Sequence, residues 1–234
     1  MIENPPLIQI KKSTSRNRPS QEQINSFKDI PTGFICDAMD GYGALSPAIK
    51  PLAIPGRSVN HIAGPALTVF SGAADVLGMA IALSEIKEGD IVLNGVNGWQ
   101  GTAAVGDRIA GMIKNNGGQG LVTDGPMRDL NGIIETGLDC FCTGLNPNSP
   151  FNSGPAKIGF ALDIGGKTVN SGDMVIADTD GVTVVPFNKI DEVINKISRI
   201  IEVENDMDIK VSNGLKISDS ASELIKSNKV VYVD

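Results

Sequence analysis

The sequence predicts the α/β fold class, and within it an α/β/β sandwich with central βαβ units and a C-terminal helix. Two observations lead to this prediction. From residue 61 to residue 143, buried-strand patterns alternate with amphipathic helical patterns across short connections, which is typical of right-handed βαβ units. Beyond Pro155, short alternating segments meet at glycine-containing turns, which is typical of an antiparallel β layer.

The two ends of the chain lie outside this pattern. The expected organisation is an N-terminal arm over 1–19, one domain over 20–206 and a C-terminal tail over 207–234. Within the domain, Ser20 and Gln23 form a capping-box pattern that predicts a helix over 21–28. Thr32 is expected to cap the next helix, which should end before Gly41.

The central alternation predicts four strands and three helices. The strands are expected over 61–71, 90–93, 120–123 and 139–143, and the helices over 73–83, 107–116 and 129–136. Parallel strands bring the loops that follow them to one edge of the sheet, where ligands bind in folds of this kind. The loops over 95–106 and 124–128 should therefore meet at that edge.

The β layer and a long helix complete the domain. Strands are expected over 160–164, 167–170, 174–178 and 182–186, followed by an amphipathic helix over 189–204. Asp178 and Asp180 in this layer allow two interpretations, a metal-ligating pair or an Asp-Gly hairpin turn. The turn is favoured because Asp-Gly is a common hairpin signal.

The composition restricts the partners and the location. The 234 residues carry a formal net charge of −7 without a basic face, which argues against nucleic acid as a partner. No apolar run has the length of a signal peptide or a membrane span, so a cytoplasmic protein without membrane contact is expected. Three cysteines and the single His61 lack zinc-site spacing, which favours buried thiols and a hydrogen-bonded histidine in the core or in a strand.

The segment LVTDGPMRD places Arg128 and Asp129 just after a buried strand, at the start of a helix. The planar guanidinium suits a carboxylate, and the aspartate offers the hard oxygen ligands that Mg²⁺ and Mn²⁺ prefer. Such a pair could hold a 2-oxo acid by its carboxylate and a cation at its carbonyl. The alternative is structural: Asp129 stabilises a helix N-terminus, and Arg128 pairs with it or with Asp124.

A second candidate site lies at Gly106, Asp107, Arg108 and Ile109, where a helix begins. Free backbone N–H groups at such a position form an anion site, and Asp107 could relay a proton through a water molecule. Helix capping by Asp107 is the alternative. Trp99, in the preceding glycine-rich loop, has either a place in the pocket wall or a packing role.

Four ordered segments carry a resemblance to a known family. They are GPALTVFSG, KEGDIVLNGVNGWQGTAAVGD, GLVTDGPMRDLNGI and IGGKTVNSGDMVIADTDGVTVVP. Together they resemble the RraA-like family, which joins 4-hydroxy-4-methyl-2-oxoglutarate aldolases to protein regulators of ribonuclease E. The match covers residues 31–200. The resemblance implies a homotrimer, or a hexamer made of two trimers, with active sites between neighbouring subunits.

The resemblance also assigns roles to the candidate residues. Asp129 would ligate Mg²⁺ or Mn²⁺, Arg128 would bind the pyruvyl carboxylate, and Asp107 would assist proton transfer. The backbone amides of 106–109 would support the same substrate. A glutamate from the C-terminal helix of an adjacent subunit would face the site, with Glu202 or Glu204 as its counterpart.

The implied function is a metal-dependent lyase that cleaves 4-hydroxy-2-oxo acids to pyruvate. Oxaloacetate decarboxylation passes through the same pyruvate enolate, so one site could perform both reactions. One departure is Gly132, since aldolases of the family usually carry an acidic residue three positions after the metal aspartate. The alternative function is a non-catalytic regulator that binds an arginine-rich segment of a ribonuclease.

Overall fold

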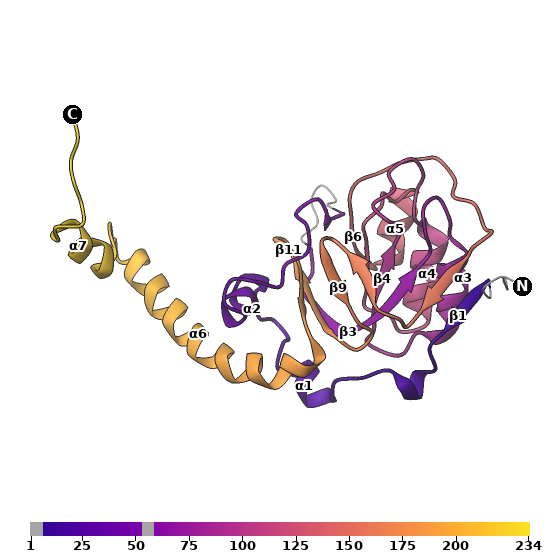
Figure 1. Cartoon of the computed structure of the whole chain (residues 1–234), viewed down its shortest axis with the longest axis horizontal. Coiled ribbons are helices and arrows are strands. Elements are labelled where there is room, and N and C mark those ends of the chain that lie inside the picture. Colours follow the sequence, from indigo (N-terminus) through magenta and orange to yellow (C-terminus); the bar gives the residue numbers. More distant parts are fainter. Residues whose placement is uncertain (1–6, 53–58) are drawn as a thin grey trace, which may run out of the picture.

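The computed structural model describes residues 7–52 and 59–234. It has a central sheet with helices on one face, and it confirms the predicted α/β class (Figure 1). The strand order along the sheet is β1 (Ile8–Ile10), β7 (Ala156–Ile158), β3 (Ile62–Phe70), β4 (Ile91–Gly95), β5 (Gly120–Thr123), β6 (Asp139–Cys142) and β2 (Lys50–Pro51). The four strands from β3 to β6 are mutually parallel, as the βαβ pattern predicts.

The longest of these strands, β3, joins the two β layers. Its second half, from Ala66, pairs in parallel with β4. Its first half pairs antiparallel with β10 (Met174–Asp178), which continues through a hairpin into β11 (Gly181–Val185). Because both of its halves are paired and covered, nearly every residue of β3 is buried. This explains why its sequence is an unbroken apolar run.

Each face of the sheet has its own core. On one face pack α3 (Leu77–Ala82), α4 (Asp107–Asn115) and α5 (Leu130–Thr136), through a cluster that includes Val92, Ile113 and Met127. The other face carries the hairpin β8–β9 (Leu162–Ile164, Lys167–Val169) and the β10–β11 hairpin, through residues such as Leu93, Phe141 and Val175. Helices, sheet and second β layer follow one another, which is the predicted α/β/β arrangement.

The N-terminal helices and α6 form a third cluster. The capping box is present: the Ser20 side chain accepts from the Gln23 N–H, and α1 covers Gln21–Asn25. The predicted capping role of Thr32 is wrong, because Thr32 is the first residue of α2 (Thr32–Ala38). Its N–H and its hydroxyl both donate to the carboxylate of Asp178, over 2.8 Å each.

Part of the predicted N-terminal arm belongs to the sheet. Residues 1–6 lie outside the described part, but β1 pairs in parallel with β7 at the sheet edge. Two ion pairs hold the following segment against the body, Arg16 with Glu85 and Arg18 with the buried Asp90. The sequence did not predict β1, β2 or β7, since they are too short to show an alternation and form no hairpin; β8 and β9 are as short, but the Gly165-Gly166 turn between them indicates one.

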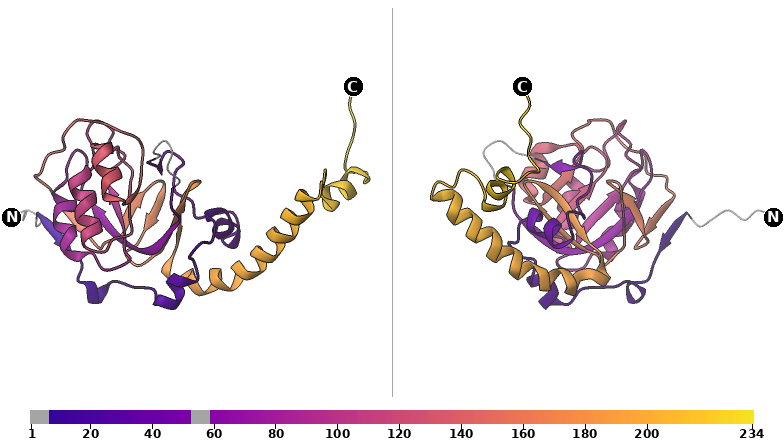
Figure 2. Two further views of the ribbon diagram at one scale, coloured as in Figure 1. Left: turned by 180° about the vertical axis from the view of Figure 1, so that it is seen from behind. Right: turned by 60° about the vertical axis from the view of Figure 1, so that its left-hand side comes forward.

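The C-terminal helix is longer than predicted. α6 covers Ile190–Ser212 and buries Ile190, Val193 and Ile197 against the body. Beyond them it runs away from the body toward α7 (Asp219–Ile225), as Figure 2 shows from two sides. Apolar side chains such as Val203 stay exposed on the projecting part. Among residues 7–52 and 59–234, no helix combines the length and apolar character needed to cross a bilayer.

Candidate active site

A cavity of about 540 Å³ opens between α3, α4 and the loop that leads into α5. All the residues that the sequence placed at the two candidate sites line it: Gly106, Asp107, Arg108, Ile109, Arg128 and Asp129. The two predicted loops do meet. A two-residue bridge between Val105 and Met127 joins them just before the site residues, so β-type pairing fixes their relative position.

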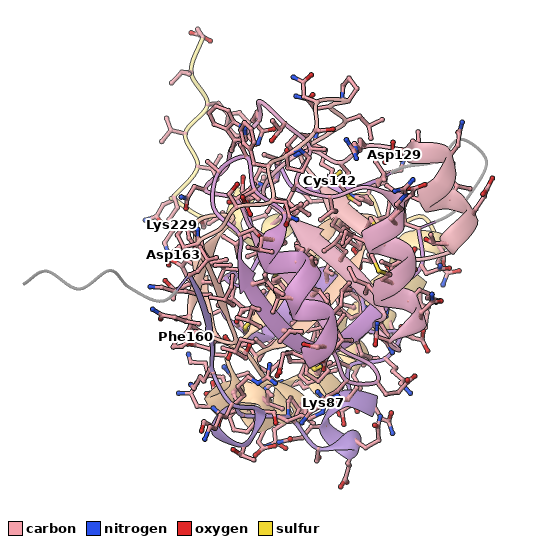
Figure 3. All side chains as sticks on the ribbon, turned by 90° about the vertical axis from the view of Figure 1, so that its right-hand side faces the viewer. Lys87, Asp129, Cys142, Phe160, Asp163 and Lys229 are labelled. Carbon is pink, nitrogen blue, oxygen red and sulfur yellow. The ribbon has the colours of Figure 1, made fainter. Side chains whose placement is uncertain are left out.

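Asp129 enters α5 in a left-handed conformation, with φ 63° and ψ 46° (labelled in Figure 3). Few residues other than glycine adopt this region, although aspartate and asparagine tolerate it best. Asp129 occupies the N-cap position of α5, but its side chain makes no capping hydrogen bond, so of the structural alternative only the pairing of Arg128 with Asp129 is present. The carboxylate instead lies 3.2 Å from the Nε of Arg128.

Arg128 is held by two neighbours. Its Nε faces Asp129, and its NH1 group donates to the Oγ of Ser149. The other predicted partner, Asp124, is engaged elsewhere, because its carboxylate accepts from the N–H groups of Val96 and Gly98. A guanidinium has five N–H donors in a fixed fork, so these contacts use only part of its capacity.

The beginning of α4 is arranged differently from the prediction. Gly106 is the residue before the helix, and the Oδ1 of Asp107 accepts from the N–H of Arg108 at 2.7 Å. The Arg108 amide is therefore already engaged by Asp107. The positive end of the helix still faces the cavity, because residues 106–109 line it.

Two glycines permit the close approach of α4 and α5. A Cβ at Gly106 would overlap the Oδ2 of Asp129, and a Cβ at Gly132 would lie 2.7 Å from the Cβ of Asp107. Real Cβ atoms essentially never come that close. The departure at Gly132 thus has a physical reason, since the side chain of Asp107 occupies the space that a side chain at 132 would need.

The donor set of the cavity fits a hard divalent cation. Asp107 and Asp129 supply carboxylate oxygens, and 43% of the Asp129 side chain is exposed to solvent. Among the described residues, no cluster of three or more His, Cys, Asp or Glu side chains could enclose a metal. Mg²⁺ commonly binds through one or two carboxylates and keeps several waters, so these residues fit Mg²⁺ or Mn²⁺ rather than a fully enclosed ion.

Asp75 is a supporting residue that the sequence analysis missed. It is buried, and its carboxylate accepts from three backbone N–H groups, those of Leu77, Ser153 and Gly154. It thereby ties the start of α3 to the segment that carries Pro150 and Asn152 into the cavity wall. An aspartate two residues before an apolar helix is a signal that could have revealed it. This anchor also explains why α3 begins at Leu77 and not at 73.

Several predictions about other residues are settled by their contacts. Asp178 accepts from the Asp180 N–H at the β10–β11 hairpin, in agreement with the favoured turn. The ring of His61 contacts the Asp29 N–H and the Ile30 carbonyl, so the predicted hydrogen bonding is present, although His61 is half-buried and directly precedes β3. Trp99 lies over Gly101 and is absent from the described lining of the cavity, so its place in the pocket wall is not found.

The cysteines and the C-terminal glutamates lie apart from the site. Burial raises the pKa of the thiols of Cys140 and Cys142 above the ordinary value, which opposes a nucleophilic role and agrees with the predicted buried thiols. The third cysteine, Cys36, is only half-buried. Glu202 and Glu204 lie on the projecting part of α6, and neither lines the cavity of its own chain.

The sequence of this chain matches a family model from residue 32 to residue 184, a span that contains both loops of the cavity. The model is described as RraA-like, Aldolase/RraA. The chain belongs to the RraA-like family. The family name covers both an aldolase and the protein RraA, so membership alone does not choose between catalysis and regulation.

Two relatives match about three quarters of this chain. One is a protein of Halalkalibacterium halodurans named "Putative 4-hydroxy-4-methyl-2-oxoglutarate aldolase", 33% identical over 176 residues that make up 75% of this chain and 82% of that protein. Another is Protein DlpA of Legionella pneumophila, 29% identical over 77% of this chain but only 30% of that protein.

Solved structures share the RraA-like fold. Streptomyces coelicolor RraAS2, described as an unusual member of the RNase ES inhibitor RraA protein family, superposes with a TM-score of 0.71 at 25% identity, over 82% of this chain and all of that one. An uncharacterised protein of Pseudomonas syringae pv. tomato reaches 0.74 at 24% identity, over 86% of this chain and 96% of that chain.

Proposed function

We propose that this chain is a divalent-cation-dependent lyase that cleaves 4-hydroxy-2-oxo acids, of the 4-hydroxy-4-methyl-2-oxoglutarate type, to pyruvate. The observation that carries the proposal is the ion pair of Arg128 and Asp129, 3.2 Å apart, which lines one cavity with the beginning of α4. The 33% identity to a protein named for this aldolase activity supports it.

Different residues of the cavity bind different groups of the substrate. The guanidinium of Arg128 binds the carboxylate next to the 2-oxo group through its remaining N–H groups. Asp129, with Asp107 nearby, would hold Mg²⁺ or Mn²⁺ beside the 2-oxo oxygen. The cation, when bound, acts as a Lewis acid on that carbonyl. The start of α4 adds a positive potential on the same side.

Proton transfer falls to Asp107. In retro-aldol cleavage a base removes the proton of the 4-hydroxyl, the C3–C4 bond breaks, and its electron pair moves toward the 2-oxo group. C3 then takes up a proton to give pyruvate. Asp107 is half-buried at the cavity wall, so its carboxylate can exchange protons with water that contacts the substrate. Oxaloacetate decarboxylation needs the same electron flow and is proposed as a second activity.

We further propose that the active protein is a homotrimer or a hexamer. The support is the projecting part of α6, on which Glu202 and the apolar Val203 are exposed and Glu204 is half-buried in the described chain. In the assembly, one of these glutamates reaches the cavity of an adjacent subunit. Light scattering after gel filtration tests the mass, and a monomer would contradict it.

The central test is a coupled assay for pyruvate with Asp129→Ala. We expect the wild type to release pyruvate with Mg²⁺ or Mn²⁺ and to stop in EDTA, and the variant to release none. Glu135→Ala is the matched control, because Glu135 is exposed on the same helix and outside the cavity. Undiminished turnover by Asp129→Ala refutes the proposal.

The same assay addresses the second candidate, a non-catalytic regulator that binds an arginine-rich segment of a ribonuclease. The similarity to RraAS2 and the net charge of −7 favour this candidate. A regulator predicts no pyruvate with or without the cation.

A further inference from the structure

Arg108 is a second arginine in the cavity, and the proposed chemistry at the 2-oxo end does not use its side chain. It lies in the first turn of α4 and is exposed. Arg16, Arg18 and Arg128 each pair with a carboxylate, whereas Arg199, on α6 and outside the cavity lining, makes no ion pair in the described structure. Within residues 7–52 and 59–234, the guanidinium of Arg108 makes no ion pair or hydrogen bond, since its only polar contact is through its backbone N–H.

Within the described residues, neither neighbouring carboxylate makes an ion pair with this guanidinium. Asp107 directs its Oδ1 to the Arg108 amide and packs against Gly132, and Asp129 pairs with Arg128. An arginine remains charged at any physiological pH, and its planar fork matches a carboxylate. The guanidinium of Arg108 is therefore still without a carboxylate partner after Arg128 has bound the carboxylate beside the 2-oxo group.

The cavity that contains the two arginines also has apolar lining residues. They are Val76 just before α3, Ala80 of α3 and Met112 of α4, and 39% of Met112 is exposed. Arg108 and Met112 are four residues apart on one helix, so their side chains share a face. At roughly 30 Å³ per water, 540 Å³ has room for about eighteen waters, far more than a pyruvyl unit needs. The rest of the substrate lies along these apolar residues.

We propose that Arg108 binds the distal carboxylate of the substrate, and that it makes the enzyme selective for dicarboxylic over monocarboxylic 4-hydroxy-2-oxo acids. The inference rests on the proposed function. Arg128 holds the carboxylate at the reacting end, the apolar residues cover the carbon chain, and Arg108 holds the far end. A ligand with a methyl group in place of the distal carboxylate leaves Arg108 without its partner.

The test compares two substrates that differ only at the far end, 4-hydroxy-2-oxoglutarate and 4-hydroxy-2-oxopentanoate. Both release pyruvate, so one assay serves for both. Arg108→Gln should lower kcat/KM for the dicarboxylate by about 10- to 100-fold, mainly through KM, because a charge-assisted hydrogen bond is lost. The monocarboxylate value should stay unchanged. Lys114→Gln, on the same helix but outside the described cavity lining, is the control and should change neither.

A binding measurement separates this inference from the proposed function. 2-Oxoglutarate and 2-oxopentanoate carry no 4-hydroxyl and cannot be cleaved, and their binding can be measured by calorimetry. Wild type should bind 2-oxoglutarate about tenfold or more tightly than 2-oxopentanoate, and Arg108→Gln should remove the difference. Equal binding of the two by wild type, or an equal effect of the variant on both, overturns the role of Arg108. If wild type binds 2-oxoglutarate selectively but releases no pyruvate from the 4-hydroxy substrates, the proposed lyase activity is refuted and the role of Arg108 in binding is not.

Discussion

The glycine at position 106 offers the sharpest test of the site geometry. Its backbone has φ −130° and ψ −167°, a conformation that alanine adopts freely. In Gly106→Ala the new Cβ would overlap the Oδ2 of Asp129 and lie 3.1 Å from the Cγ of Arg128. Both atoms belong to side chains that can move, so the substitution should leave the fold intact and displace the ion pair.

The expected loss of activity follows from how far the Asp129 side chain must move. An ordinary contact begins at 3.4 Å, and restoring it requires the Asp129 oxygen to move by about 1 Å, a misplacement that can cost about 100-fold in rate. We expect kcat/KM for pyruvate release to fall by about that factor while the melting temperature stays nearly unchanged.

Gly111→Ala is the matched control for this experiment. A Cβ at Gly111, in the middle of the same helix, would lie 3.5 Å from the Cγ2 of Thr136, which is an ordinary contact. It should raise the stability by about 0.5–1 kcal/mol, because alanine favours a helix interior over glycine, and leave the rate unchanged. Full activity in Gly106→Ala refutes the assigned geometry.

Three further predictions concern the framework around the site. Asp75→Ala removes the acceptor of three backbone N–H groups and should cost about 3 kcal/mol in urea unfolding; a loss below about 1 kcal/mol contradicts the anchoring role. Thr32→Ala should lower the free energy of unfolding by about 1 kcal/mol, because the hydrogen bond from its hydroxyl to Asp178 is lost. Thr32→Ser keeps the hydroxyl and should retain most of that stability; an equal loss in both variants would show that the hydroxyl does not contribute. Burial raises the pKa of Asp173 above its ordinary 3.8, so the folded state binds this proton more tightly than the unfolded chain does. The stability of wild type relative to Asp173→Asn should therefore fall as the pH rises from 3.8 through the raised pKa, and a difference that does not vary with pH in urea unfolding contradicts this.

The sequence was sufficient for the parts of the fold that are long and buried. The parallel strands from β3 to β6 were predicted close to their observed limits, because each has an apolar centre and lies next to a helical pattern of period 3.6. The extension of α6 to Ser212 was missed, since acidic residues interrupt the apolar pattern beyond Glu204. A helix that leaves the body has no core contact to impose a pattern on its sequence.

The composition of the site was also predictable, but its internal contacts were not. Parallel topology brings the loops after β4 and β5 together, which is why Asp107 and Arg128 could be assigned to one cavity. Neither the left-handed backbone of Asp129 nor the use of the Arg108 amide by Asp107 can be read from residue types. Both depend on distances that only the packing of α4 against α5 determines.

The backbone of Asp129 places stability and activity in opposition. A left-handed aspartate costs the fold on the order of 1 kcal/mol, and the helix that follows receives no cap from this side chain in return. Asp129→Gly would relieve that strain, so the inactive protein should be the more robust one. Under the proposed function, selection for thermal tolerance alone would act against aspartate at this position, and its persistence in a lineage would indicate that catalysis is under selection.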